Sequence, residues 1–105
     1  MYIEHYRGLV RFSEEKMSKV NLFTSERMFA DLYCLLPAQE QRVHTHADCD
    51  KVYHLLDGRC TCILGEEERE LLAGESCIAP AGTPHGLRND SGENAVFLVM
   101  MGGKV

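Results

Sequence analysis

The sequence lacks an apolar run long enough to cross a bilayer, and it lacks an excess of positive charge. Its longest apolar run, residues 95–101, is far shorter than the roughly 20 residues that a spanning helix needs. The formal net charge is -5, and the chain shows no cluster of Lys and Arg of the kind that binds phosphate. We therefore expect neither a membrane nor a nucleic acid as a partner.

No linker, internal repeat or low-complexity segment divides the 105 residues, and the N-terminus lacks the basic and apolar parts of a signal peptide. A chain of this length has room for one hydrophobic core. Its apolar content of 45% and charged content of 26% are ordinary for a soluble globular protein. We expect a single domain over residues 1–105, located in the cytoplasm.

The five cysteines, at positions 34, 49, 60, 62 and 77, are odd in number and show no zinc-ribbon spacing. Without a secretory signal, this pattern predicts reduced thiols. Cys60 and Cys62 would share one face of a strand, where we interpret them as small buried apolar residues rather than a reactive pair. Cys49 lies three residues after His46 and could approach a metal there, although imidazole and carboxylate groups are nearer.

Helical patterns are almost absent, whereas short apolar runs alternate with turn residues about every eight to twelve positions. Residues 13–17 form the one helix-like stretch. We expect extended segments at 3–12 and 19–23, then strands at 27–36, 41–46, 52–56, 60–64, 68–72, 77–79, 85–88 and 95–101. No helix is available to connect parallel strands, so the pattern predicts an all-β chain whose two sheets pack face to face.

His44, Thr45 and His46 form the central motif. On a strand, residues two apart point to the same face, so both imidazoles would project together and could bind one metal ion. Taken alone, the pair fits two surface or hydrogen-bonded histidines equally well.

The second half of the chain supplies the missing context, because Gly74, Pro80, Gly82, His85 and Asn89 stand at characteristic spacing. They resemble the second motif of the cupin family at every fixed position, and residues 38–58 resemble its first motif less completely. The resemblance covers about half of the chain and implies a double-stranded β-helix, the jelly-roll cupin barrel. Its glycines and prolines fit a purely structural role, in which they shape the turn that returns His85 to the barrel.

In cupins a metal ion lies inside the barrel, and the resemblance implies His44, His46 and His85 as its ligands here. The site would hold one divalent transition metal, since imidazole suits zinc, iron, nickel, copper and, less well, manganese. Three neutral nitrogens with open positions are typical of a catalytic rather than a structural site. The alternative is a degenerate barrel whose histidines bind no metal.

Motif one departs from the family pattern at Ala38 and Lys51. Ala38 replaces a glycine, which we expect to affect only a turn. Lys51 replaces the usual glutamate ligand, and a protonated ammonium cannot bind a cation. Its neutral amine could bind the metal, a bulge could turn Asp50 inward, or Lys51 could pair with Asp50 or Asp48 beside a three-histidine site. We favour the three-histidine site, with Asp50 as the leading candidate for a fourth ligand.

Strand alternation places Tyr53 and Leu55 on the same inward face as Lys51, whereas His54 points to the other side. Lys51 and Tyr53 are therefore candidate catalytic residues, which would supply a proton or hold an anionic group. For Tyr53, a role in the core is the more common one.

The resemblance leaves the function open, because cupins include dioxygenases, sugar isomerases, decarboxylases, lyases, storage proteins and sensor domains. We expect a metal-dependent enzyme of the dioxygenase, isomerase or lyase type, acting on a small polar organic molecule. The alternatives are a non-catalytic module that senses or buffers a metal or small ligand, and a metal-free structural barrel. Exposed edge strands also predict a homodimer, in which the N-terminal segment up to residue 12 or 23 packs across the partner.

Overall fold

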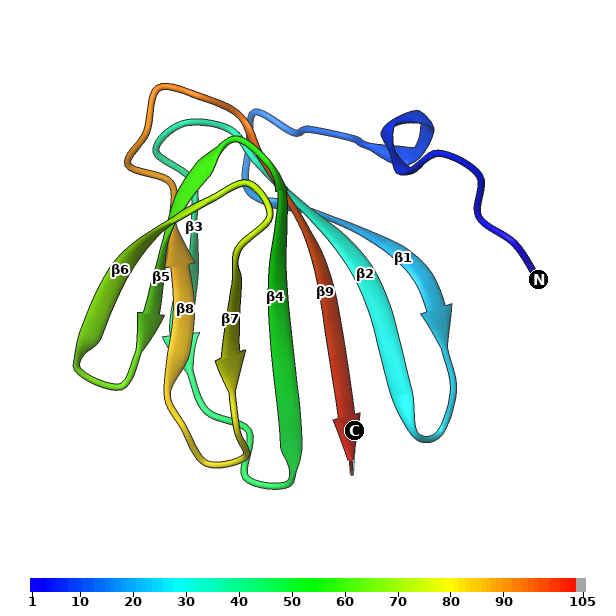
Figure 1. The fold of residues 1–105 in the computed structure, drawn as a ribbon, viewed down its shortest axis with the longest axis vertical. Coiled ribbons are helices and arrows are strands. Elements are labelled where there is room, and N and C mark those ends of the chain that lie inside the picture. Colours follow the sequence, from blue (N-terminus) through cyan, green and yellow to red (C-terminus); the bar gives the residue numbers. More distant parts are fainter. Residues whose placement is uncertain (104–105) are drawn as a thin grey trace.

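The computed structural model describes residues 1–103, and strands dominate it (Figure 1). A short 3-10 helix, η1 (Tyr6–Leu9), comes first. The strands follow as β1 (Ser18–Thr24), β2 (Met28–Leu35), β3 (Glu40–His44), β4 (Cys49–Asp57), β5 (Arg59–Leu64), β6 (Glu67–Leu72), β7 (Ser76–Ala79), β8 (His85–Arg88) and β9 (Ala95–Gly103).

The strands form two antiparallel sheets, which Figure 1 shows as two layers. One sheet has the order β1-β2-β9-β4-β7 and the other the order β3-β8-β5-β6. The prediction of an all-β jelly roll is thus confirmed. Within residues 1–103, no helix is long and apolar enough to span a membrane.

The core lies between the inner faces of the two sheets. Along β4, every second residue from Cys49 to Leu55 is buried, as expected for a strand with one face on a core. The buried cluster between the sheets consists of Tyr33, Leu35, Tyr53, Leu55, Cys60, Cys62, Leu71, Cys77, Leu87, Ala95, Phe97 and Val99.

The N-terminal segment covers the outer face of the five-stranded sheet. Tyr6, Leu9 and Val10 pack against a second cluster that includes Leu32, and the Tyr6 hydroxyl donates to Asp57 Oδ2 at 2.7 Å. The predictions of an extended segment at residues 3–12 and of a helix at residues 13–17 are both wrong. The 3-10 turn forms instead where its apolar side chains can pack on the sheet.

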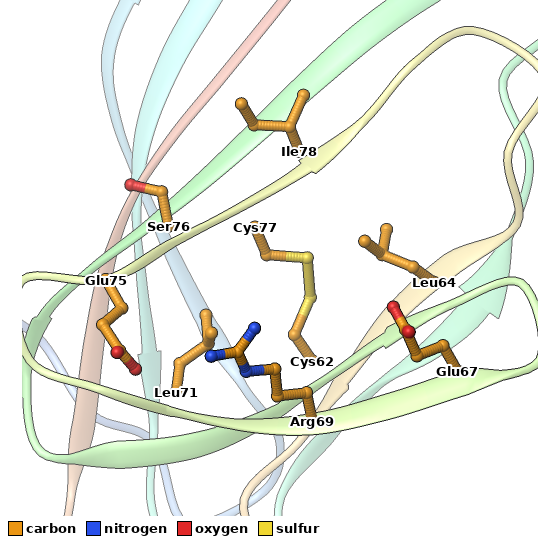
Figure 2. Close-up of a pocket in the computed structure, with 9 residues that line it drawn as sticks. All are labelled: Cys62, Leu64, Glu67, Arg69, Leu71, Glu75, Ser76, Cys77 and Ile78. Atoms are coloured by element: carbon orange, nitrogen blue, oxygen red, sulfur yellow. A yellow bond between two sulfur atoms is a disulfide. The ribbon is translucent and has the colours of Figure 1, made fainter.

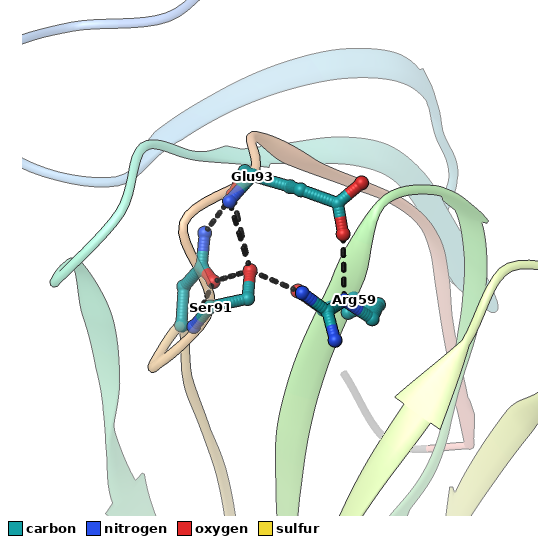
Figure 3. A network of polar contacts seen from close by, with 4 residues as sticks. Arg59, Ser91 and Glu93 are labelled. Atoms are coloured by element: carbon teal, nitrogen blue, oxygen red, sulfur yellow. Dashed lines mark hydrogen bonds and ion pairs between the residues drawn. The ribbon is translucent and has the colours of Figure 1, made fainter.

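The turn between β8 and β9 is built on the buried side chain of Asn89. Its Nδ2 donates to Glu93 O at 2.8 Å, and its Oδ1 accepts a hydrogen bond from the Ser91 hydroxyl at 2.7 Å. Figure 3 shows Ser91 and Glu93 beside Arg59, which makes an exposed ion pair with Glu93 at 2.6 Å. The Asn89 side chain thus forms hydrogen bonds with backbone and side-chain groups of the turn that leads into β9.

A disulfide joins Cys62 of β5 to Cys77 of β7, and therefore links the two sheets covalently. Figure 2 shows it among the side chains that line a pocket, with Leu64, Leu71 and Ile78 around it. The pocket has a volume of about 220 Å³. The prediction of reduced thiols is wrong for these two residues. Cys60 and Cys62 are both buried on one face, as expected, but Cys62 faces a cysteine of the opposite sheet, a pairing that strand alternation alone does not reveal.

Candidate metal centre

His44, at the end of β3, lies directly opposite His85, at the start of β8, in the pairing of these strands. A bulge between Gln41 and His44 shifts the register of β3 before this point. Gly86 makes the close approach feasible, because a Cβ there would lie 2.7 Å from Gln41 O. Two of the three histidines are therefore brought together by strand pairing.

His46 lies beyond the end of β3, which stops at His44 rather than continuing to His46 as expected. Its position is set by a backbone hydrogen bond, because Gly82 N–H donates to His46 O at 2.8 Å. Gly82 belongs to the turn between Pro80 and Pro84 that precedes His85. The turn thus connects the loop of His46 to the strand of His85.

The three imidazoles converge on one point. One nitrogen from each of His44, His46 and His85 lies within 4.8 Å of the others. The ring centroids of His44 and His85 are 4.3 Å apart, and those of His46 and His85 are 5.5 Å apart. The group is therefore positioned to bind a metal ion.

Backbone carbonyls fix the tautomers of two of these rings. Nδ1 of His44 lies 2.8 Å from Arg42 O, and Nδ1 of His85 lies 2.8 Å from Thr83 O. A carbonyl can only accept, so Nδ1–H donates in each case and the neutral ring keeps its lone pair on Nε2. Nε2 of His85 is buried and has no hydrogen-bond partner among the described residues. A buried nitrogen with a free lone pair fits a metal ligand.

The surroundings of His46 and His85 favour the neutral form of these two rings. Burial lowers the pKa of His46 and His85, and the positive charges of His44 and Lys51 lower both pKa values further. The hydrogen bond to Thr83 acts in the opposite sense on His85. Since a metal binds neutral imidazole, the low pKa values reduce competition from protons.

Asp50 lies outside this group. Its side chain is exposed, on the opposite face of β4 from Lys51, and its Oδ1 accepts a hydrogen bond from Ala81 N–H at 2.9 Å. In this structure Asp50 therefore supports the turn before His85. Its role as a fourth ligand stays a prediction, and it would require the side chain to turn to the inner face of β4.

Lys51 and Tyr53 face the interior, as expected from alternation. Lys51 is only 2% exposed, and its Nζ lies 5.3 Å from the ring centroid of Tyr33 and 5.0 Å from that of Tyr53. In residues 1–103 it forms no ion pair, so the suggested pairing with Asp48 or Asp50 is absent. Burial lowers the pKa of Lys51 to about 8, and the charge of Lys19 contributes to this shift.

Tyr53 connects the metal centre to the edge of the barrel. Its ring centroid lies 6.0 Å from that of His85, and its hydroxyl donates to Gln41 Oε1. Burial, together with the neighbouring Tyr33, raises the pKa of Tyr53 far above its usual range. The phenol therefore stays protonated and can act as a hydrogen-bond donor. His54 lies on the other face, as expected, with Nδ1 2.6 Å from Ser76 Oγ.

Sequence reasoning missed several polar residues on the inner face of β1 and β2. Asp31 is only 9% exposed and accepts a hydrogen bond from Asn21 Nδ2 at 2.8 Å. Lys19 is paired with Tyr33 in the register of the two strands, and its Nζ lies 5.2 Å from the Tyr33 ring centroid. Alternation along residues 27–36 puts Asp31 and Tyr33 on one face, but their proximity to Lys51 depends on a strand order that the sequence does not reveal.

Comparison with solved structures shows extensive similarity. The TT1209 protein from Thermus thermophilus is 48% identical, with a TM-score of 0.94 and 98% of each chain covered. A conserved protein with a double-stranded β-helix domain from Klebsiella pneumoniae is 21% identical, with a TM-score of 0.91, covering 99% of this chain and 91% of that chain. An RmlC-like cupin protein from Desulfovibrio desulfuricans is 23% identical, with a TM-score of 0.85, covering 97% and 96% of the two chains.

A search of the curated proteins finds no match. The family model described as a cupin domain matches residues 31–101, which is more than half of the chain and contains all three histidines. The chain therefore belongs to the cupin domain family.

Proposed function

We propose that this protein is a metal-dependent enzyme that acts on a small polar organic molecule. His44, His46 and His85 would hold one divalent transition metal, and their imidazole nitrogens suit zinc, iron, nickel, copper and, less well, manganese. The observation that carries the proposal is the convergence of the three rings, with Nδ1 of two of them tethered and Nε2 of His85 buried without a partner among the described residues.

The metal would polarise an oxygen of the bound molecule, and the chain's own residues would handle protons and orientation. Lys51, with a pKa of about 8, exchanges a proton near neutral pH. Tyr53 donates a hydrogen bond from a phenol that remains protonated. This combination suits reactions of the dioxygenase, isomerase or lyase type.

One solved structure described as a predicted decarboxylase has the same fold. A predicted oxalate decarboxylase from Thermotoga maritima shares the fold, with a TM-score of 0.76 over 90% of this chain and 97% of that chain. At 18% identity this likeness concerns the fold alone.

We also propose a homodimer formed through the N-terminal segment. Tyr2, Ile3, Phe12 and Phe23 are exposed apolar residues in or near this segment, and β1 is an edge strand. A cytoplasmic location is part of the same proposal. It stands in tension with the Cys62–Cys77 disulfide, because cytosolic thiols are usually kept reduced.

The test is to purify the protein without added metal and to measure bound metal by mass spectrometry. We expect close to one ion per chain, and a loss of most of it in His44→Ala. His54→Ala is the matched control, because His54 lies on the outer face and should leave the metal content unchanged. The metal-loaded protein is then screened with sugars, keto acids and catechols. Turnover supports the proposal, whereas metal retention without turnover supports a binding module instead.

A further inference from the structure

We propose that the molecule bound at the metal centre is a small organic acid whose carboxylate is held by Lys51 and Lys19. This inference rests on the proposed function for the metal-bound end of the molecule. The lysine end has its own evidence, which comes from the inner face of the five-stranded sheet, where Lys51 is buried and Lys19 is exposed.

The two ammonium groups approach the same aromatic ring from different strands. Lys19 Nζ lies 5.2 Å and Lys51 Nζ 5.3 Å from the ring centroid of Tyr33. Lys19 belongs to β1 and Lys51 to β4, which are separated in the sheet by β2 and β9. An aromatic ring attracts each cation, but the two positive charges repel each other. An anion near both would remove this repulsion.

Lys51 is an inward-facing cation whose ammonium lies near the rings of Tyr33 and Tyr53 but has no anionic partner within residues 1–103. Although its side chain is almost fully enclosed, it makes neither a hydrogen bond nor an ion pair within residues 1–103. Buried charges are normally paired, because removing an ion from water is unfavourable. An ammonium near the metal site that two aromatic rings attract but no carboxylate pairs can accept the anionic group of a ligand.

The acidic groups nearby do not supply this partner. Asp31 acts on Lys51 only at a distance, since the two form no ion pair within 4.0 Å, and its Oδ1 already accepts from Asn21. Glu40 lies at the start of β3, an exposed edge strand. One buried carboxylate therefore faces two lysines, and the interior keeps an excess of positive charge.

A recess at the barrel edge lies beside Lys19. It has a volume of about 590 Å³ and lies where β1 and β3 begin, with Lys16, Lys19, Glu40 and Gln41 among its lining residues. Gln41 also accepts the hydroxyl hydrogen bond of Tyr53, whose ring lies beside that of His85, so Gln41 connects the recess to the residues of the metal centre. A molecule of a few carbon atoms fits this space, and Lys16 adds a positive charge at its entrance.

A carboxylate fits these groups better than a phosphate. Lysine provides a point charge with rotatable donors, and the tethered histidines have no N–H left on Nε2 to offer to further anionic oxygens. Phosphate recognition usually adds arginine forks or a set of backbone N–H groups, and the recess includes no arginine among its lining residues.

The experiment is calorimetric titration at pH 7 of zinc-loaded and of metal-free protein, with malonate, malonamide and inorganic phosphate as probes. Zinc content is measured by mass spectrometry in each sample. We expect malonate to bind at least about tenfold more tightly than malonamide, and more tightly than phosphate. Lys51→Met and Lys19→Met should each weaken malonate binding by about fivefold or more without changing zinc content. Arg59→Met removes an equal charge from an exposed ion pair and serves as the control.

The outcomes separate the two proposals. If the protein binds no zinc, the proposed function is wrong. The inference is then tested on the metal-free protein, in which Lys51→Met must still weaken malonate binding more than Arg59→Met does. If zinc binds but malonate shows no preference over malonamide, or phosphate binds more tightly, the inference is wrong. Equal effects of Lys51→Met and Arg59→Met would also overturn it. Lys19 is exposed, so Lys19→Met keeps the test decisive if the Lys51 variant folds poorly.

Discussion

Lys51 places an ammonium group in the core between the rings of Tyr33 and Tyr53. Burial lowers its pKa from the ordinary 10.5 to about 8. A shift of this size corresponds to about 3 kcal/mol of lost stability while the group is charged in both folded and unfolded states. The unfolded chain binds more protons between pH 8 and 10.5, so stability rises with pH across this window. Below pH 8 the full penalty is present.

Replacing Lys51 with Met should therefore stabilise the metal-free protein at pH 7, by up to about 3 kcal/mol. The gain should shrink as the pH is raised from 8 towards 10.5. Urea unfolding at a series of pH values measures this difference. Lys16→Met is the control, because Lys16 is exposed and should change stability little. A gain that is absent at pH 7, or that is constant across the pH series, would contradict the account.

Ala38 has a φ of 72°, in the left-handed region that glycine adopts without strain. The turn holds it there, with Ala38 N–H donating to Asn89 O at 2.8 Å. The family motif has a glycine at this position, and the positive φ gives the physical reason. A left-handed backbone conformation costs a residue with a Cβ about 1–2 kcal/mol of folding free energy. Glycine avoids this cost, but its greater freedom in the unfolded chain offsets part of the gain.

Ala38→Gly should consequently raise the free energy of unfolding by about 0.5–1 kcal/mol. The nearby exposed Ala47 has no positive φ, so Ala47→Gly should be neutral or destabilising. Chemical denaturation of both variants gives the comparison. Two changes of the same sign and size would show that the conformation of Ala38 stores no strain.

At the scale of the elements, strand alternation predicted which face of β4 is buried, including the inward positions of Lys51 and Tyr53. It could not predict which strands would be neighbours. The pairing of His44 with His85 depends on a bulge in β3 and on the close approach at Gly86, and His46 is placed by a loop hydrogen bond rather than by a strand. The motif resemblance found these three histidines where periodicity alone was ambiguous.

The residues that sequence reasoning missed share one cause. Lys19 and Asp31 lie near Tyr33 because β1 pairs with β2 in a register that sets Lys19 opposite Tyr33 and Asn21 opposite Asp31. Cys62 and Cys77 meet because β5 and β7 face each other from opposite sheets. Each contact is set by sheet order and register, which a local hydrophobic pattern does not specify.

The disulfide is an element-scale constraint, because it connects β5 to β7 across a sequence separation of 15 residues. Closing a loop of this length stabilises a folded chain by about 3 kcal/mol in the chain-entropy model. Reduction should therefore lower the melting temperature by on the order of 10 °C. The Cys62→Ala/Cys77→Ala variant should melt near the temperature of the reduced wild-type protein, and reductant should not change its melting temperature. An unchanged wild-type melting temperature, with thiol titration proving reduction, would contradict this expectation.

At the scale of the whole molecule, apolar side chains of the N-terminal segment pack on the five-stranded sheet. Phe12 in this segment and Phe23 in β1 stay exposed. We expect light scattering to give twice the chain mass of 11.9 kDa. Phe23→Glu should shift the protein towards the monomer, because a charge would be buried at the contact. Ile78, which is 57% exposed on edge strand β7, supplies the control Ile78→Glu. A dimer that dissociates only with the Ile78 change would place the interface elsewhere, and a wild-type monomer would exclude the dimer.

The claim on which the chemistry depends is that the two sheets bring three imidazole rings to a shared ion. Anomalous scattering from a crystal of the protein, recorded across the absorption edges of first-row transition metals, tests it directly. The account predicts one anomalous peak inside the barrel, within bonding distance of a nitrogen from each of His44, His46 and His85. A crystal grown with excess zinc that shows no peak at this position would contradict it.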